Sequence, residues 1–269
     1  MRIAIDISST LEKKTGIGYY VHNLLNQYKN YHHEFEFYYL FDPKNVRLNS
    51  LQRVIWSNIK LPPKYKKIKA DILHIPGFSG PLIPGKPKKV TTVHDLIGII
   101  YPQNLRLPSR IFWSKWLPLC VKTSKHIIAD SFNTKNDVIR LLGIPENKIS
   151  VIYLAADSSF KPIQDLKYLE TVRTKYSLPN NFILHVGTIE PRKNIPNLIE
   201  AFAKYSNENI TDLSLVISGL KSWGYPKVKE TIDRLKISNK IIITDYIDDN
   251  DLPALYNLSR FLVSTSLYE

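Results

Sequence analysis

The sequence contains a single cysteine, Cys120, among 269 residues. This excludes an internal disulfide and leaves no cysteine cluster that could hold zinc. No apolar run approaches the roughly 20 residues that a membrane-spanning helix needs. The first residues lead directly into a strand-like run, Arg2 to Asp6, without the plan of a signal peptide. We therefore expect a cytoplasmic protein.

The sequence also lacks an arginine-rich tract, a zinc-finger spacing and an aromatic RNA-binding signature. Its formal net charge is nevertheless +13, which suggests an anionic partner. Three anionic partners fit a basic protein: nucleic acid, anionic lipid headgroups and a polyphosphate substrate. Nucleic acid is the least supported of the three, because the sequence lacks the motifs named above.

Strand and helix signals alternate along the first part of the chain, which is typical of a doubly wound α/β sheet. Predicted strands cover residues 3–5, 35–41, 54–57, 72–75, 90–93, 127–129 and 150–154. Predicted helices cover 18–28, part of 109–124, and 134–142. For the last helix, Thr134 and Asp137 predict a capping box and Gly143 predicts the stop.

A weaker pattern between residues 160 and 180 marks the predicted domain junction, which gives domains over 1–162 and 163–269. A second alternation follows, with strands over 182–186, 213–218, 241–244 and 261–264 and helices over 166–176, 195–205, 227–235 and 251–257. The alternation stops at Glu269. We therefore expect the second domain to be incomplete.

The segment Leu184 to Asn194, with sequence LHVGTIEPRKN, has the plan of a diphosphate site. An apolar strand stops at Gly187, and Arg192 and Lys193 stand directly before a helix that Asn194 can cap. First-turn amides and two cations both favour a bound anion. A basic surface loop is the alternative.

Gly16 and Gly18 are predicted to lie on a loop between the first strand and the first helix, where backbone amides can approach a phosphate or sugar. A dinucleotide-binding fingerprint is the rival interpretation, with Asp42 as the ribose contact. It is disfavoured because the glycines lie far from the strand and Val21 occupies the third glycine's position. A simple flexible loop also remains open.

His94 follows the predicted strand 90–93 and should emerge at the carboxyl end of the sheet, where ligands bind in such folds. Its position alone favours a hydrogen-bonded core histidine. The neighbouring Asp95 is predicted to be structural, as an Asx-type cap of the following turn.

Six segments in this order resemble the family-4 glycosyltransferases, which are retaining enzymes with two facing Rossmann-like domains, the GT-B fold. The segments are TGIGYY at 15–20, TVHDL at 92–96, IADS at 128–131 followed by Thr134-Lys135, VIYLAAD at 151–157 through FKP at 160–162, the run Gly187 to Asn194, and SLYE at 266–269. One departure is Thr188, where many members carry arginine.

This resemblance implies a role for each donor-side residue. Gly16 and Gly18 would face the inter-domain cleft and touch the donor. Gly187 would lie at the diphosphate, whose contacts would rest on Arg192 and Lys193. Neither a metal nor another cofactor is implied.

The resemblance also implies catalytic roles for two residues. His94 would contact the transferred sugar near the reacting carbon. Glu269 would be the first glutamate of a paired motif and would hold sugar hydroxyls, and the second glutamate would lie beyond it. The expected activity is retaining transfer of a hexose, with mannose from GDP-mannose as the first guess, to a glycan or lipid-linked acceptor in surface polysaccharide synthesis. A nucleotide-sugar epimerase and a non-catalytic, truncated nucleotide-binding remnant stay open as alternatives.

Residues 106–125 mix cations with aromatic and aliphatic side chains. Such a helix can lie on an anionic bilayer, at the inner face of the membrane, where lipid-linked acceptors are found. Pro108 fits a helix start, and Pro118 predicts a kink or break. A helix packed on the core with solvated lysines is the alternative.

Overall fold

The computed structural model describes residues 1–8, 16–42, 48–77, 80–82, 86–105, 107–209 and 211–268. The chain forms two compact units, Met1–Ala155 and Ala156–Glu269. The domain boundary that the sequence places after residue 162 stays a prediction.

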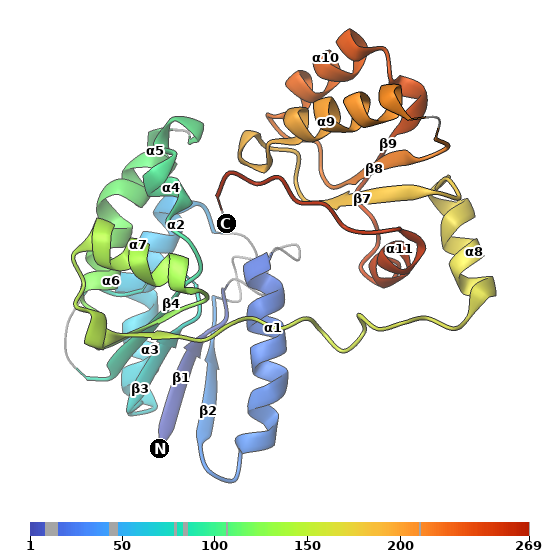
Figure 1. Ribbon diagram of the computed structural model, residues 1–269. Helices are drawn as coiled ribbons and strands as arrows, with labels where there is room; N and C mark the ends of the chain where they lie inside the picture. Colours follow the sequence, from blue (N-terminus) through green and yellow to red (C-terminus); the bar gives the residue numbers. More distant parts are fainter. Residues whose placement is uncertain are drawn as a thin grey trace. The chain divides into compact units, whose positions relative to one another are not determined.

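The first unit is built on a parallel sheet of six strands in the order β2-β1-β3-β4-β5-β6. Figure 1 labels β1 to β4 of this sheet. Its strands are β1 (Arg2–Asp6), β2 (Glu36–Leu40), β3 (Ile72–Ile75), β4 (Lys88–Val93), β5 (His126–Ala129) and β6 (Ile149–Val151). Because all the strands run the same way, the residues that follow β3, β4 and β5 meet at one edge of the sheet.

The helices of this unit are α1 (Gly16–Tyr28), α2 (Ser50–Ile55), α3 (Leu61–Lys67), α4 (Ile97–Ile100), α5 (Leu107–Ile111), α6 (Leu117–Lys122) and α7 (Phe132–Leu142). Short 3-10 turns lie at Lys29–Tyr31, Pro102–Asn104 and Glu146–Lys148, and π-helical turns at η3 (Trp56–Lys60) and η5 (Phe112–Trp116).

The predicted strand over residues 54–57 is wrong, because these residues are helical, in α2 and η3. Helix α2 begins with a capping box in which Asn49 and Gln52 bind each other's backbone amides. Trp56 is buried, and its indole Nε1 donates to Asp6 at 3.1 Å. The β-branched residues Val54 and Ile55 are therefore helical, because α2 is capped at its start and Trp56, which follows it, is buried against the sheet.

Both π turns stand just before a proline. The amide of Leu61 donates to the Trp56 carbonyl and that of Leu117 to the Phe112 carbonyl, five residues back in each case. Pro62 and Pro118 follow as the second residue of the next helix. Proline has no N–H and its ring clashes with the carbonyl four residues earlier, so a wider turn accommodates it. The kink or break predicted at Pro118 is therefore a π turn just before the proline, through which the helix continues.

Helix α7 begins two residues earlier than predicted. Ser131 is its N-cap, with Oγ accepting from the amide of Thr134 at 3.1 Å, so the expected capping box of Thr134 and Asp137 is wrong. Gly143 ends the helix in the left-handed region at φ +65°, which confirms the predicted stop.

The second unit contains the parallel strands β7 (Phe182–Val186), β8 (Ser214–Ser218) and β9 (Ile241–Asp245). The strand predicted over residues 261–264 is not regular, although residues 260–263 run beside β7. The amide of Arg260 donates to Phe182 O at 2.8 Å, and that of Val263 to Leu184 O at 2.8 Å. The ladder is limited to one bridge, between Leu184 and Leu262, so this segment adds an irregular neighbour to the sheet.

Helices of the second unit cover both faces of its sheet (Figure 1). They are α8 (Leu166–Lys175), α9 (Ile195–Glu208), α10 (Tyr225–Leu235) and α11 (Leu252–Leu258), with 3-10 turns at η7 (Pro191–Lys193) and Ser238–Lys240. Ile183 and Leu215 point into the core formed with α9 and α10, whereas Leu184 and Val216 point into the core with α11. This alternation produces three layers, as expected for a doubly wound unit.

Candidate functional site

The loop after β7 is held against the segment after β8. Gly187 has a φ of +152°, and its amide donates to Ser218 O at 2.8 Å. Further along, the amide of Ile189 donates to Leu220 O at 2.9 Å. The loop therefore runs alongside residues 218–220, at and after the end of β8, before the chain enters η7 and α9.

Two glycines outside the predicted site allow this close approach. A Cβ on Gly219 would lie 2.0 Å from Gly187 O, and a Cβ on Gly224 would lie 2.9 Å from Glu190 Cα. Sequence reasoning missed both. The sequence did contain a signal for Gly219. This glycine directly follows the last residue of β8, Ser218, just as Gly187 directly follows the last residue of β7, Val186.

Arg192 is engaged by the chain itself. Its Nη2 lies 2.6 Å from Glu190 Oε1, and each side chain is 18% exposed. The Nη1 donates to Tyr268 O at 3.0 Å, and the amide of Leu267 donates to Arg192 O at 2.9 Å. The guanidinium thus fastens the last described residues to η7 while its charge is balanced by Glu190.

Lys193 and Gly187 lie together, as the sequence predicted for a diphosphate site, since a Cβ on Gly187 would be 3.5 Å from Lys193 Cε. Asn194 occupies the N-cap position of α9, as the sequence predicted, but it adopts a left-handed conformation with φ 54° and makes no side-chain cap hydrogen bond. Pro196 lacks an amide hydrogen, so in the first turn Ile195 and Asn197 supply the backbone donors.

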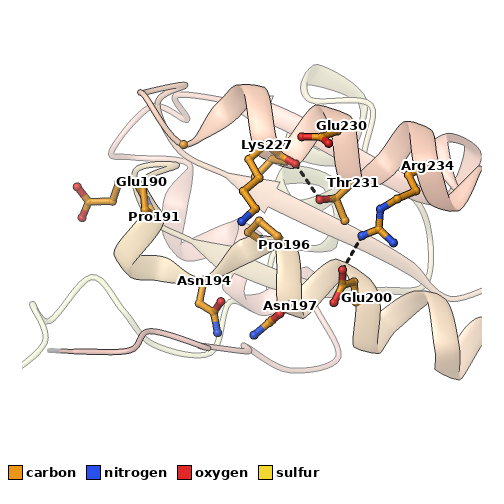
Figure 2. A pocket seen from close by; sticks show the side chains of 12 residues that line it. Glu190, Pro191, Asn194, Pro196, Asn197, Glu200, Lys227, Glu230, Thr231 and Arg234 are labelled. Carbon is orange, nitrogen blue, oxygen red and sulfur yellow. Dashed lines mark hydrogen bonds and ion pairs between the residues drawn. The ribbon is translucent and has the colours of Figure 1, made fainter. Parts of the chain in front are cut away.

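A hollow of about 230 Å³ lies between α9 and α10. Figure 2 shows Arg234 and Glu200 joined across it, at 2.5 Å. Its charged lining consists of Glu190, Glu200, Glu230, Lys227 and Arg234. Three carboxylates against two cations do not favour a diphosphate, and Gly187, Arg192 and Lys193 are not part of the lining.

Gly16 and Gly18 are not on a loop, which corrects the prediction. Both lie in α1, Gly16 as its exposed first residue and Gly18 buried one position after Ile17. Because first-turn amides have no carbonyl partner within their helix, this end of α1 can still present donors to an anion or hydroxyl.

His94 lies directly after β4, at the carboxyl edge of the sheet. Its Nδ1 is 2.5 Å from Asp130 Oδ2, and its Nε2 is 2.8 Å from Pro76 O. The two side chains are 11% and 12% exposed. Asp130 belongs to one of the quoted motifs but was given no role from the sequence. The pairing of the two strands explains why Asp130 meets His94. Val93 is in register with Ala129, so the residues that follow them, His94 and Asp130, lie side by side.

Aromatic and polar groups surround the His94 ring. Tyr20 of α1 meets it edge to face at 4.8 Å, and the Thr134 hydroxyl donates to His94 O at 2.9 Å. His74 Nε2 lies 3.1 Å from the Thr92 hydroxyl. Burial, and then the positive charge of His94, lower the pKa of His74 to about 4, so His74 is neutral at pH 7.

Asp95 has the structural role that was predicted for it. Its Oδ1 accepts from the amide of Ile97 at 3.0 Å, which is an Asx-type turn at the start of α4. Glu269 lies outside the described residues. Among the residues that are described, no three His, Cys, Asp or Glu side chains gather as a metal site, and no helix is long and apolar enough to cross a bilayer.

Family models match most of the chain. Residues 14–160 match the model described as Glycosyltransferase Family 4, and residues 170–269 match Glycosyl transferases group 1. The chain belongs to glycosyltransferase family 4. The first match includes His94 at the carboxyl edge of the first sheet, and the second includes Gly187 and the loop that follows β7.

Among curated proteins, the family-4 chain is similar to O-antigen chain mannosyltransferase B of Escherichia coli, at 30% identity over 75% of this chain and 52% of the relative. The chain spans about half the length, or less, of the curated relatives that it matches.

Among solved structures, it is similar to sucrose-phosphate synthase from Thermosynechococcus elongatus, with a TM-score of 0.70 and 14% identity, over 100% of this chain and 76% of the other. It is also similar to HepE from Anabaena, crystallised with UDP and glucose, with a TM-score of 0.59 and 15% identity, over 99% and 74%. These likenesses confirm the predicted fold class, α/β of the GT-B type with Rossmann-like units.

Proposed function

We propose that this protein is a retaining glycosyltransferase that moves a hexose from a nucleoside-diphosphate sugar to a growing glycan or lipid-linked acceptor in surface polysaccharide synthesis. Its similarity to an O-antigen chain mannosyltransferase supports mannose as the sugar and GDP-mannose as the donor. That HepE was crystallised with UDP and glucose supports a nucleoside-diphosphate hexose as the donor class. Such donors are made in the cytoplasm, where we place the enzyme.

The observation that carries the proposal is the Gly187 loop. A glycine without a side chain, the Lys193 stem lying against it, and the first turn of α9 come together at the carboxyl end of β7. Backbone amides and a cation at this edge are suited to a diphosphate. We assign Gly187 and Lys193 to the diphosphate directly. Arg192 adds positive charge and holds the adjoining segment through Tyr268.

The remaining sites follow from the same proposal. Gly16 and Gly18 would present the amino end of α1 to the donor, His94 would meet the transferred sugar, and Glu269 would bind its hydroxyls. Charge gathers on the diphosphate as the glycosidic bond breaks, and fixed donors stabilise it most when they are in place beforehand. The departing phosphate oxygen would then take the proton of the acceptor hydroxyl during front-face attack.

Calorimetric titration with GDP and UDP tests the diphosphate site. Lys193→Ala should weaken binding of the preferred nucleotide by about tenfold or more, because a charge-assisted hydrogen bond contributes roughly 1.5–3 kcal/mol. Arg192→Ala should also weaken it, and the double variant most. Lys204→Ala, which removes an exposed cation further along α9, is the control. Affinity that is equal in the control and in Lys193→Ala would remove the diphosphate from this loop.

Product analysis tests the reaction. Mass spectrometry of mixtures of nucleotide sugars and a mannan or lipid-linked acceptor should show one added hexose, with GDP-mannose the best donor. His94→Ala should lower turnover while nucleotide affinity stays. An epimerase would convert the donor without any acceptor, and a non-catalytic remnant would bind nucleotide and form no product.

We also propose that α5, η5 and α6 contact anionic lipid. Their buried side, with Phe112, Leu117 and Val121, packs on the core. Outward they expose three apolar side chains, Leu107 at 69%, Ile111 at 55% and Leu119 at 52%. The exposed cations Arg110, Lys115 and Lys122 lie along the same run. Apolar side chains flanked by cations suit a headgroup region.

Flotation with vesicles checks this contact. Vesicles containing phosphatidylglycerol should carry the protein up the gradient more than phosphatidylcholine vesicles, and salt should reduce the difference. Leu107→Ser with Ile111→Ser should abolish flotation, whereas Leu51→Ser, which alters an equally exposed leucine on α2, should not. Binding that ignores lipid charge would contradict the proposal.

A further inference from the structure

The hollow between α9 and α10 has no part in the proposed function. It encloses about 230 Å³ and begins at Glu190 and Asn194, before the first turn of α9. This is less than the roughly 300–1,000 Å³ of sites for drug-sized ligands, so the hollow suits a molecule of about one ring. In Figure 2 the Lys227 side chain extends from α10 toward Pro196 at the start of α9.

Ion pairs and a close backbone contact hold the walls of this hollow. Arg234 reaches across it to Glu200 at 2.5 Å. Arg192, just outside the lining, holds Glu190 at 2.6 Å. Where α10 begins, Gly224 packs against Glu190, since a Cβ there would lie 2.9 Å from Glu190 Cα. A site whose walls are already in place loses less entropy when a ligand binds.

Four polar side chains of the lining have no partner among the described residues. They are Asn194, Asn197, Lys227 and Glu230. Asn194 is the most informative, because it stands at the N-cap of α9 and makes no side-chain cap hydrogen bond. An asparagine at this position usually stabilises the helix by accepting from an amide of the first turn. Here the left-handed backbone, with φ 54°, leaves the Asn194 side chain at the hollow.

These groups suit a neutral molecule with hydroxyls. The two ion pairs are neutral, and the remaining charges, Lys227 and Glu230, have opposite signs. A net charge near zero favours neither a phosphate nor a metal ion. The amides of Asn194 and Asn197 both donate and accept, whereas Lys227 only donates and Glu230 only accepts. A hydroxyl also donates and accepts, and Pro196 adds an apolar surface for C–H groups.

We propose that this hollow binds one hexose unit of the glycan acceptor, as a site separate from the donor site. A hexose carries several hydroxyls on an uncharged ring, which is the chemistry that the lining matches. The proposal rests on the proposed function only in naming the glycan as the source of the hexose. This second contact raises the effective concentration of the glycan at the enzyme and so favours repeated addition to the same chain.

Amide NMR tests the hollow without a donor or any transfer. In the full chain labelled with ¹⁵N, at least one α-linked trisaccharide of mannose, glucose or galactose should shift the side-chain amide signals of Asn194 and Asn197. Asn197→Ser identifies the second of these signals. Phosphate and Mg²⁺ should leave both unchanged. The methyl glycoside of the same hexose should shift the same signals, because it is capped as a unit within a chain is.

Paired variants test the residues. Lys227→Ala with Glu230→Ala keeps the net charge and should weaken trisaccharide binding by about tenfold or more, because charge-assisted hydrogen bonds are lost. Lys229→Ala with Asp233→Ala is the matched control, since both are exposed on α10 outside the lining, and its affinity should equal that of the parent. Lys227→Gln with Glu230→Gln gives the same test if the alanine variant does not fold.

Three results would overturn the inference. They are lining signals that respond to none of the trisaccharides, lining signals that respond to phosphate or Mg²⁺ instead, and equal trisaccharide affinity in the two double alanine variants. Binding of the free hexose with exclusion of the trisaccharide would overturn the glycan as its source. A parent that binds the trisaccharide in the hollow but binds neither GDP nor UDP would instead count against the proposed function.

Discussion

Gly219→Ala is the sharpest test of how the Gly187 loop is held. The added methyl carbon would stand 2.0 Å from Gly187 O and 2.5 Å from its carbonyl carbon. Ordinary contact begins at 3.4 Å, so loop and strand end must separate by about 1.4 Å. Gly219 also has a φ of +153°, which side chains rarely adopt.

The magnitude follows from these contacts. Separation of that size breaks the bonds from Gly187 N to Ser218 O and from Ile189 N to Leu220 O, at about 1 kcal/mol each. The strained backbone adds about 1–3 kcal/mol. We therefore expect the second unit to lose about 3–5 kcal/mol. The same displacement moves the loop amides away from a bound diphosphate, so nucleotide affinity should fall by about tenfold or more, the loss expected for one charge-assisted hydrogen bond.

Hydrogen exchange and calorimetry measure the two effects. Peptides from β7 and β8 should lose protection, and GDP or UDP titration should show the loss of affinity. Gly143→Ala is the control, because it places a methyl at φ +65° with nothing within 4 Å, and it lies in the other unit. It should cost about 1–2 kcal/mol locally and leave nucleotide affinity unchanged. Parent-like protection and affinity in Gly219→Ala would refute the account of the loop.

Three further predictions concern stability in denaturant titrations. Lys89→Met should cost about 3 kcal/mol, because the buried ammonium donates to Pro81 O, Cys120 O and Thr123 Oγ1 at 2.6–2.7 Å. Burial lowers the pKa of Lys89 to about 8, so the unfolded chain binds more protons between pH 8 and 10.5; over that range the parent should gain stability relative to Lys89→Met, and a constant difference would contradict this. Although burial alone would raise it, hydrogen bonds led by that from Lys175 hold the pKa of Asp251 below its ordinary 3.8. The advantage of the parent over Asp251→Asn should therefore be full above about pH 4 and decline below it, and an advantage that does not change as the pH falls below 4 would contradict this. Ser131→Ala should cost about 1 kcal/mol and loosen α7 in hydrogen exchange, as loss of an N-cap does, and unchanged α7 protection would count against the cap.

Much of the fold could be predicted because its strands are buried on both faces. The run FILHV at 182–186 is a strand with the predicted bounds, since an apolar run between turn signals has few other uses in an α/β chain. Residues 54–57 have similar local composition but became helical. The deciding features were Asn49 and Gln52 at one end and the Trp56–Asp6 contact 50 residues away in sequence. Only the first of these is visible in a local window.

For the candidate site, sequence reasoning located single residues better than their partners. His94 and Gly187 directly follow strands, and Lys193 stands directly before a helix, as expected. Their roles stay predictions. Asp130 and Gly219 were missed because each acts on a neighbouring strand, and strand order is a property of the whole sheet. A pattern read along the chain does not show which strand ends will be adjacent.

The π turn at Phe112–Trp116 has an evolutionary consequence. It holds one residue more than a regular turn, which lets Pro118 follow without striking a carbonyl. Deleting one residue there would force the proline into a regular helix, at about 3 kcal/mol. Replacing Pro118 alone would leave the wider turn in place without the proline ring that it accommodates. In descendants of this sequence we therefore expect the insertion and the proline to be lost together, as a linked pair of changes.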